Sequence, residues 1–146
     1  MKKLLIAAII SLSSVTTAAV AEVKVGIILG FTGPIESLTP AMRDGARMAF
    51  DEASNSGNLL GGETITILEA DSTCVDSAAA TAAAEQLVAD GVAAIMGADC
   101  SGVTGAINAN VAVPNGVLMV SPSATSPGLS KIADNGTFWR TAPSDA

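Results

Sequence analysis

After its first 21 residues, the chain alternates short apolar runs with segments of helical periodicity. The first run, 23–30 (VKVGIILG), is β-branched and almost continuously apolar, which is typical of a parallel strand buried on both faces. Similar runs predict three more strands and the start of a fifth: 63–70, 92–97, 117–121 and 138–141.

Helical patterns separate these runs. Thr39 precedes Pro40, a residue suited to the first helical position, so we expect Thr39 to cap a helix that Gly57 ends. The alanine-rich segment 76–90 and the segment 102–111 predict two further helices. Helices between strands require right-handed parallel crossovers, so the pattern predicts an α/β fold with a doubly wound parallel sheet.

The first 21 residues have the three parts of a secretory signal peptide. Lys2 and Lys3 precede an apolar core at 4–10, and the small residues 19–21 (AVA) suit signal peptidase. The core is far shorter than the roughly 20 apolar residues that cross a bilayer, which argues against a membrane anchor. We therefore expect cleavage before Glu22 and an exported, periplasmic protein whose 125 remaining residues (146 minus 21) form at most one domain.

The net charge bears on which partners the protein can bind, and the cysteine content bears on disulfide formation. Removal of the two leader lysines leaves five of the 7 basic residues against 14 acidic ones, a net charge of −9 (5 minus 14). Such a surface repels phosphate backbones, so nucleic acid is excluded as a partner. Cys74 and Cys100 are the only cysteines, and export favours a disulfide between them, with two buried free thiols as the alternative.

The segments that follow the predicted strands are rich in hydroxyl groups. In a parallel α/β sheet the carboxyl ends of the strands meet at one crevice, here formed by 30–39, 71–75, 98–101 and 121–127. Serine and threonine hydroxyls there suit a small anionic group such as a carboxylate. The alternative is that they only cap helices and turns.

Enzyme chemistry has little support. The chain has no histidine, which excludes a Ser-His-Asp triad, a Cys-His pair and a histidine-based zinc site. The segment 97–104 imitates a phosphate-binding loop, but Val103 stands where the lysine is required, and the loop GFTGPI lacks the third glycine of a dinucleotide site. We expect no enzyme activity, no cofactor and no metal.

Several segments together resemble the leucine/isoleucine/valine-binding receptors of ABC transporters. The resemblance covers essentially all of 22–146 and is carried by VKVGIILGFTGP, DGARMAFDEAS, DSTC, IMGADCSGVT, VLMVSPSATSPGLS and FWRTAPSDA. It implies a periplasmic binding protein type I fold, of which 22–146 would be the N-terminal part of the first lobe, with the second lobe absent. It also implies a disulfide between the two cysteines, in agreement with the expectation from export.

The resemblance further implies a function and a site. Ser101, Ser123 and Thr125 match positions that hold the carboxylate and ammonium of an amino acid, while Leu38 stands where those receptors often have an aromatic residue. The complete receptor would close on a branched-chain-type amino acid or related small carboxylate and deliver it to a membrane permease. A ligand-sensing α/β domain that regulates a signalling partner is the alternative. The isolated part is expected to expose hydrophobic surface along the open edge of its sheet.

Overall fold

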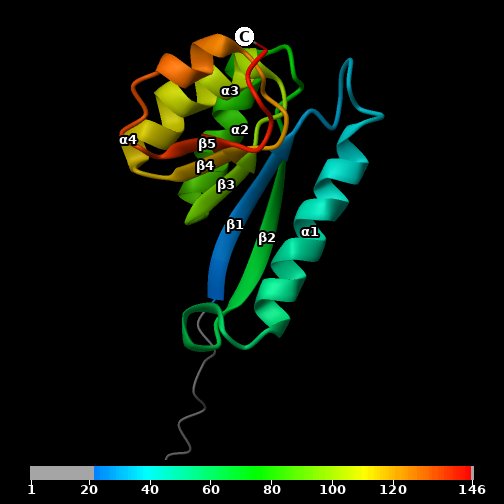
Figure 1. The fold of residues 1–146 in the computed structure, drawn as a ribbon, viewed down its shortest axis with the longest axis vertical. Coiled ribbons are helices and arrows are strands. Elements are labelled where there is room, and N and C mark those ends of the chain that lie inside the picture. The colour runs from blue at the N-terminus through cyan, green and yellow to red at the C-terminus, as the bar shows by residue number, and fades with distance from the viewer. Residues whose placement is uncertain (1–21, 146) are drawn as a thin grey trace, which may run out of the picture.

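A parallel five-stranded sheet organises the computed structural model, which describes residues 22–145 (Figure 1). The predicted signal peptide lies outside the described residues. The strand order is β2-β1-β3-β4-β5, and all four pairings are parallel. The strands are β1 (Glu22–Leu29), β2 (Thr64–Asp71), β3 (Ala94–Gly97), β4 (Leu118–Ser121) and β5 (Phe138–Arg140). This arrangement confirms the predicted α/β, doubly wound sheet.

Helices connect the strands on both faces. The helix α1 (Thr39–Asn55) lies against β1 and β2, whereas α2 (Ser77–Ala89) and α3 (Ser101–Ile107) pack together on the other face. A π-helical turn and the short helix α4 continue from α3, and two 3-10 turns complete the elements: Asn108–Ala112, Val113–Asn115, Leu59–Gly61 and Pro127–Lys131.

Two details of the helix prediction were wrong. Thr39 is the first residue of α1 and not its cap, which is Leu38. The Thr39 side chain is fully buried and its hydroxyl donates to the Glu36 carbonyl, so it points away from the helix amides that a cap would accept from. The helix predicted at 102–111 runs on to Asn115, because a wide π turn precedes Pro114 and accommodates its missing N–H group.

The main core lies between the sheet and the helices α2 and α3. Ile28, Ile95 and Met119 point from the strands toward Ile107 and Val111, and all five side chains are almost completely buried. Alternate residues of β3 and β4 point to the opposite face, because successive side chains of a strand point to opposite sides.

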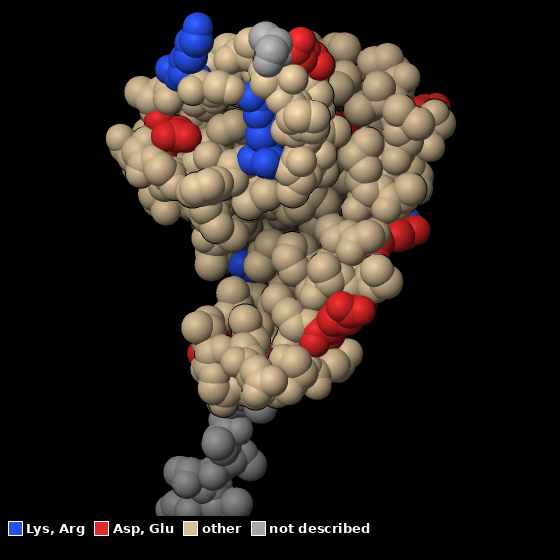
Figure 2. Space-filling view, viewed as in Figure 1, with Lys and Arg blue, Asp and Glu red and all other residues tan. Residues whose placement is uncertain are grey.

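On that opposite face, the part of the sheet beside α1 is uncovered. A groove of about 340 Å³ lies there, and the apolar residues of β1, α1, β3 and β4 that line it include Val25, Ala46, Ala49, Phe50, Ala94, Met96, Leu118 and Val120. Right-handed crossovers place the connections from β3 to β4 and β5 on the α2 side, which leaves this face open. The space-filling view shows few charged side chains between α1 and the strands β3 and β4 (Figure 2). Exposed hydrophobic surface of the described residues therefore lies on a face of the sheet, where the sequence had not predicted it.

The open face predicts self-association of the isolated chain. Leu118 is 41% exposed within it, so Leu118→Lys is expected to reduce the apparent mass in light scattering and the binding of a hydrophobic dye. Val75, which is 71% exposed outside this face, provides the control Val75→Lys. Equal effects of the two substitutions on apparent mass and dye binding would contradict the prediction, because the open face would then contribute no more to self-association than another exposed apolar residue.

Candidate functional site

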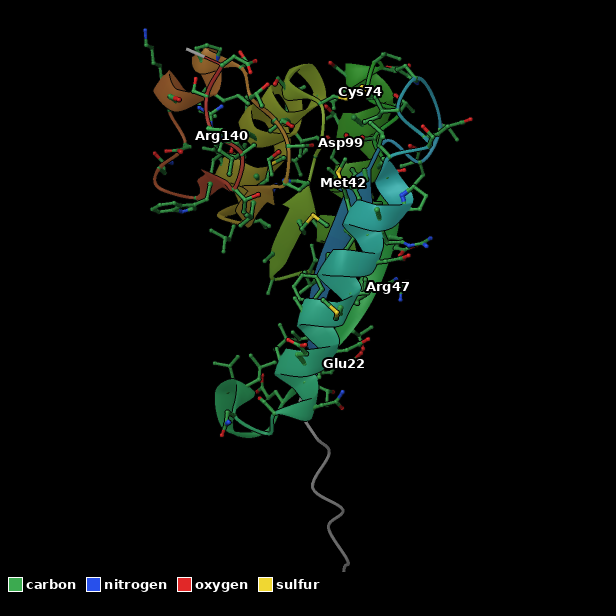
Figure 3. The ribbon with its side chains drawn as sticks, turned by 45° about the vertical axis from the view of Figure 1, so that its right-hand side comes forward. Glu22, Met42, Arg47, Cys74, Asp99 and Arg140 are labelled. Atoms are coloured by element: carbon green, nitrogen blue, oxygen red, sulfur yellow. A yellow bond between two sulfur atoms is a disulfide. The ribbon has the colours of Figure 1, made fainter. Side chains whose placement is uncertain are left out.

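The candidate site is the crest of the sheet, which we define as the loops 30–38, 72–76, 98–101 and 122–126 at the carboxyl ends of β1 to β4. Side chains of these loops converge at the upper end of the molecule, where Cys74 and Asp99 lie close to Met42 of α1 (Figure 3). Glu22, at the start of β1, lies at the opposite end. The crest thus lies at the carboxyl ends of the strands, where doubly wound sheets bind their ligands.

A carboxylate anchors the first loop of the crest. Asp71, the last residue of β2, accepts hydrogen bonds from the Thr32 hydroxyl at 2.5 Å and from the Thr73 N–H at 2.8 Å. Burial raises the pKa of Asp71, but the hydrogen bonds from the Thr32 side chain and from the backbone of Thr73, Thr32 and Phe31 outweigh it, so this pKa lies below its ordinary value. Asp71 therefore stays ionised near neutral pH and ties the loop after β1 to the end of β2.

The two cysteines join the next two loops. The structure links Cys74 to Cys100 by a disulfide, with a Cα–Cα distance of 5.2 Å, which confirms the predicted pairing. Thr73 and Cys74 both have positive φ, a conformation that non-glycine residues seldom adopt. The bond therefore holds an unusual turn after β2 against the start of α3.

The structure brings the three predicted ligand-binding residues to one part of the crest. Ser101 begins α3, and its hydroxyl oxygen accepts a hydrogen bond from the Ser126 N–H at 3.1 Å. Ser123 donates its hydroxyl to the Asp99 carbonyl at 3.1 Å and lies 3.8 Å from the Met42 sulfur. Thr125, two residues after Ser123, is half-buried, and its carbonyl accepts a hydrogen bond from the Asp145 N–H.

Sequence reasoning missed the arginine that holds this loop. Arg140, at the end of β5, donates to the carbonyls of Ala124 and Ser126 at 3.3 and 2.9 Å and to the Ser130 hydroxyl at 2.5 Å. The Thr141 hydroxyl adds a bond to the Pro122 carbonyl. The only signal in the sequence was a single arginine within the predicted strand 138–141.

The polar groups of the crest are mainly hydroxyl and backbone groups. Within residues 22–145, no three histidine, cysteine or acidic side chains lie close enough to hold a metal ion. None of the helices in that range combines the length and hydrophobicity that a bilayer crossing needs. What the crest presents is a set of hydroxyl and backbone groups, which can orient a small polar molecule by hydrogen bonds.

Comparison with known proteins places these features in a family. Residues 22–146 match the model of the periplasmic binding protein family. The Leu/Ile/Val-binding protein BraC3 of Rhizobium johnstonii is 34% identical over 111 residues, which are 76% of this chain and 29% of that protein. The leucine-specific-binding protein of Salmonella typhimurium is 31% identical over 129 residues, covering 88% of this chain and 34% of that protein.

Solved structures agree with the sequence comparison. The branched-chain amino acid transporter substrate-binding protein LivJ of Streptococcus pneumoniae, determined in complex with isoleucine, has a TM-score of 0.77 at 30% identity. The match covers 86% of this chain and 35% of that structure. The leucine-binding protein LivK of Thermotoga maritima has a TM-score of 0.73 at 28% identity. The chain spans about a third of the length of the relatives it matches, and on the family match and the shared fold it belongs to the periplasmic binding protein family.

Proposed function

We propose that this chain is the N-terminal part of the first ligand-binding lobe of a solute-binding receptor of an ABC transporter. The receptor would act in the periplasm after removal of the signal peptide, capture a branched-chain-type amino acid or a related small carboxylate, and deliver it to a membrane permease. It would perform no chemical reaction. Relatives whose names specify leucine, isoleucine and valine as ligands support this ligand class.

One observation carries the proposal, namely the hydrogen bond between Ser101 and the loop 123–126. It brings a hydroxyl from the start of α3 next to the Ser123 and Thr125 positions that follow β4. A hydroxyl that accepts one bond can still donate its own hydrogen, so Ser101 can serve a ligand carboxylate while it holds the loop. A threonine hydroxyl can donate to the carboxylate or accept from the ammonium, which suits Thr125 to a zwitterionic ligand.

The affinity of the complete receptor tests the proposal. Ser101→Ala and Thr125→Ala are each expected to weaken binding of L-leucine or L-isoleucine by about 1–3 kcal/mol, roughly 5- to 150-fold, because a buried ligand group loses its partner. Isothermal titration calorimetry measures this change directly. Thr64→Ala, at the exposed start of β2 and at the far end of the sheet, is the matched control and is expected to bind normally.

Two results would reject the proposal. Unchanged affinity in both crest variants would show that the ligand does not contact Ser101 or Thr125. A complete receptor that binds none of L-leucine, L-isoleucine, L-valine and their carboxylate analogues would reject the ligand class itself.

A further inference from the structure

The end of β3 carries a buried carboxylate that the proposed ligand contacts do not use. Asp99 is only 3% exposed, and neither of the two ion pairs of the described residues, Arg43–Asp44 and Arg47–Glu69, includes it. A buried charge without a counter-ion is costly unless hydrogen bonds compensate it. The role of Asp99 can therefore be read from the groups that supply those bonds.

Three donors surround the Asp99 carboxylate, each from a different loop of the crest. Its Oδ2 accepts from the Gly30 N–H at 2.7 Å, after β1. Its Oδ1 accepts from the Cys100 N–H at 2.9 Å and from the Ser72 hydroxyl at 3.2 Å, after β3 and β2. The backbone carbonyl of the same residue accepts from Ser123, after β4. Asp99 thus contacts all four loops that make up the crest.

Close packing reinforces the contact with Gly30. A Cβ atom at residue 30 would lie 3.2 Å from the Cys74 Cβ and 3.3 Å from the Cys74 backbone nitrogen, both tighter than ordinary contacts, and would touch the Asp99 Oδ2 at 3.4 Å. The absence of a side chain at Gly30 therefore lets its amide approach the carboxylate beside the disulfide. Hydrogen bonds to an ionised acceptor are about twice as strong as neutral ones, so these bonds are suited to fixing the loops.

Direct contact between Asp99 and a ligand does not fit this geometry. The side chain is almost fully buried and its two oxygens already accept three hydrogen bonds from the protein, so it presents little surface to an ammonium group. We propose that Asp99 is the positioning residue of the crest, which sets the loop after β1 and the start of α3 relative to the loop after β4. This inference rests on the proposed function only in taking the crest as the ligand site.

Amide hydrogen exchange in the exported chain tests the inference without any ligand. Asparagine at residue 99 has one acceptor oxygen, so the orientation that keeps Ser72 and Cys100 satisfied turns its NH2 group toward the Gly30 N–H. Exchange at Gly30 is expected to accelerate roughly tenfold or more in Asp99→Asn, the factor for one lost hydrogen bond. The Ser126 N–H, which donates to Ser101 and does not touch Asp99, is also expected to exchange faster.

Two control variants separate positioning from a general loss of stability. Asp134→Asn removes the same charge from a turn, where Asp134 accepts from the Gly136 N–H, and is expected to change exchange only near that turn. Leu87→Ala destabilises the core under α2 and is expected to change the globally exchanging amides together. In Asp99→Asn, by contrast, Gly30 and Ser126 should change more than the amides of the core.

Unchanged exchange at Gly30 and Ser126 in Asp99→Asn, or a change no larger than that of the core amides, would overturn the inference. If this variant does not fold, Ser72→Ala removes one donor from the same carboxylate, and faster exchange at Gly30 is again the expected result. Normal exchange in that variant would equally overturn the inference. Failure of the complete wild-type receptor to bind L-leucine would count against the proposed function alone, since the exchange result requires no ligand.

Discussion

Replacement of Cys74 and Cys100 together by serine is expected to lower the free energy of unfolding by about 3–4 kcal/mol, the value for loops of this length in the chain-entropy model. The two cysteines are 26 positions apart, so the bond restricts a substantial part of the unfolded chain. In the folded state, Thr73 and Cys74 keep positive φ angles beside the bond. Without the covalent link, this turn would be held mainly by the hydrogen bonds to Asp71 and Asp99.

Urea denaturation of residues 22–146 with and without a thiol reductant measures the effect. The wild-type chain should unfold at a lower urea concentration in reductant, whereas the double serine variant should unfold at the same concentration in both. Intact mass before and after reduction should differ by two hydrogen masses in the wild type only. Equal stability of the oxidised and reduced wild type would contradict the prediction.

The strands could be predicted from sequence because buried parallel strands are apolar almost throughout. The apolar pattern shows which residues are buried, but it does not show which of them form the hydrogen bonds between strands. Val92 is 6% exposed and belongs to the predicted strand 92–97, yet it precedes β3, which begins at Ala94. The helix after β3 was predicted too short for a related reason, since asparagine and proline indicate a helix end unless a π turn accommodates them.

The loops of the crest could also be predicted, because the topology alone places the carboxyl ends of parallel strands together. The residues that hold those loops could not. Asp99 and Arg140 bond mainly to backbone N–H and carbonyl groups, which nearly every residue carries, and neither belongs to an ion pair of the described residues that a charge pattern could have revealed. A single charged residue also has no periodicity. Only the folded structure shows which charged side chains lie beside backbone N–H and carbonyl groups that have no partner within a helix or sheet.

Arg140 provides the second large effect. Arg140→Ala is expected to lower the free energy of unfolding by about 2–3 kcal/mol, because it removes charge-assisted hydrogen bonds and leaves half-buried carbonyls without partners. Arg140→Lys should be intermediate, since an ammonium cannot reproduce the planar fork that reaches Ala124, Ser126 and Ser130. Because the same loop carries Thr125, affinity for L-leucine in the complete receptor should fall in the same order.

Arg47 is the matched control, because its guanidinium also makes two contacts, at 2.8 and 2.7 Å, with the carboxylate of Glu69. Counting ion pairs would make Arg47 the more important residue. Its side chain is 46% exposed, however, and surface ion pairs contribute about 0–1 kcal/mol. Arg47→Ala should therefore destabilise the chain much less than Arg140→Ala in the same urea titration. An equal or larger cost for Arg47→Ala would show that the neutral carbonyls of the crest loop do not depend on Arg140.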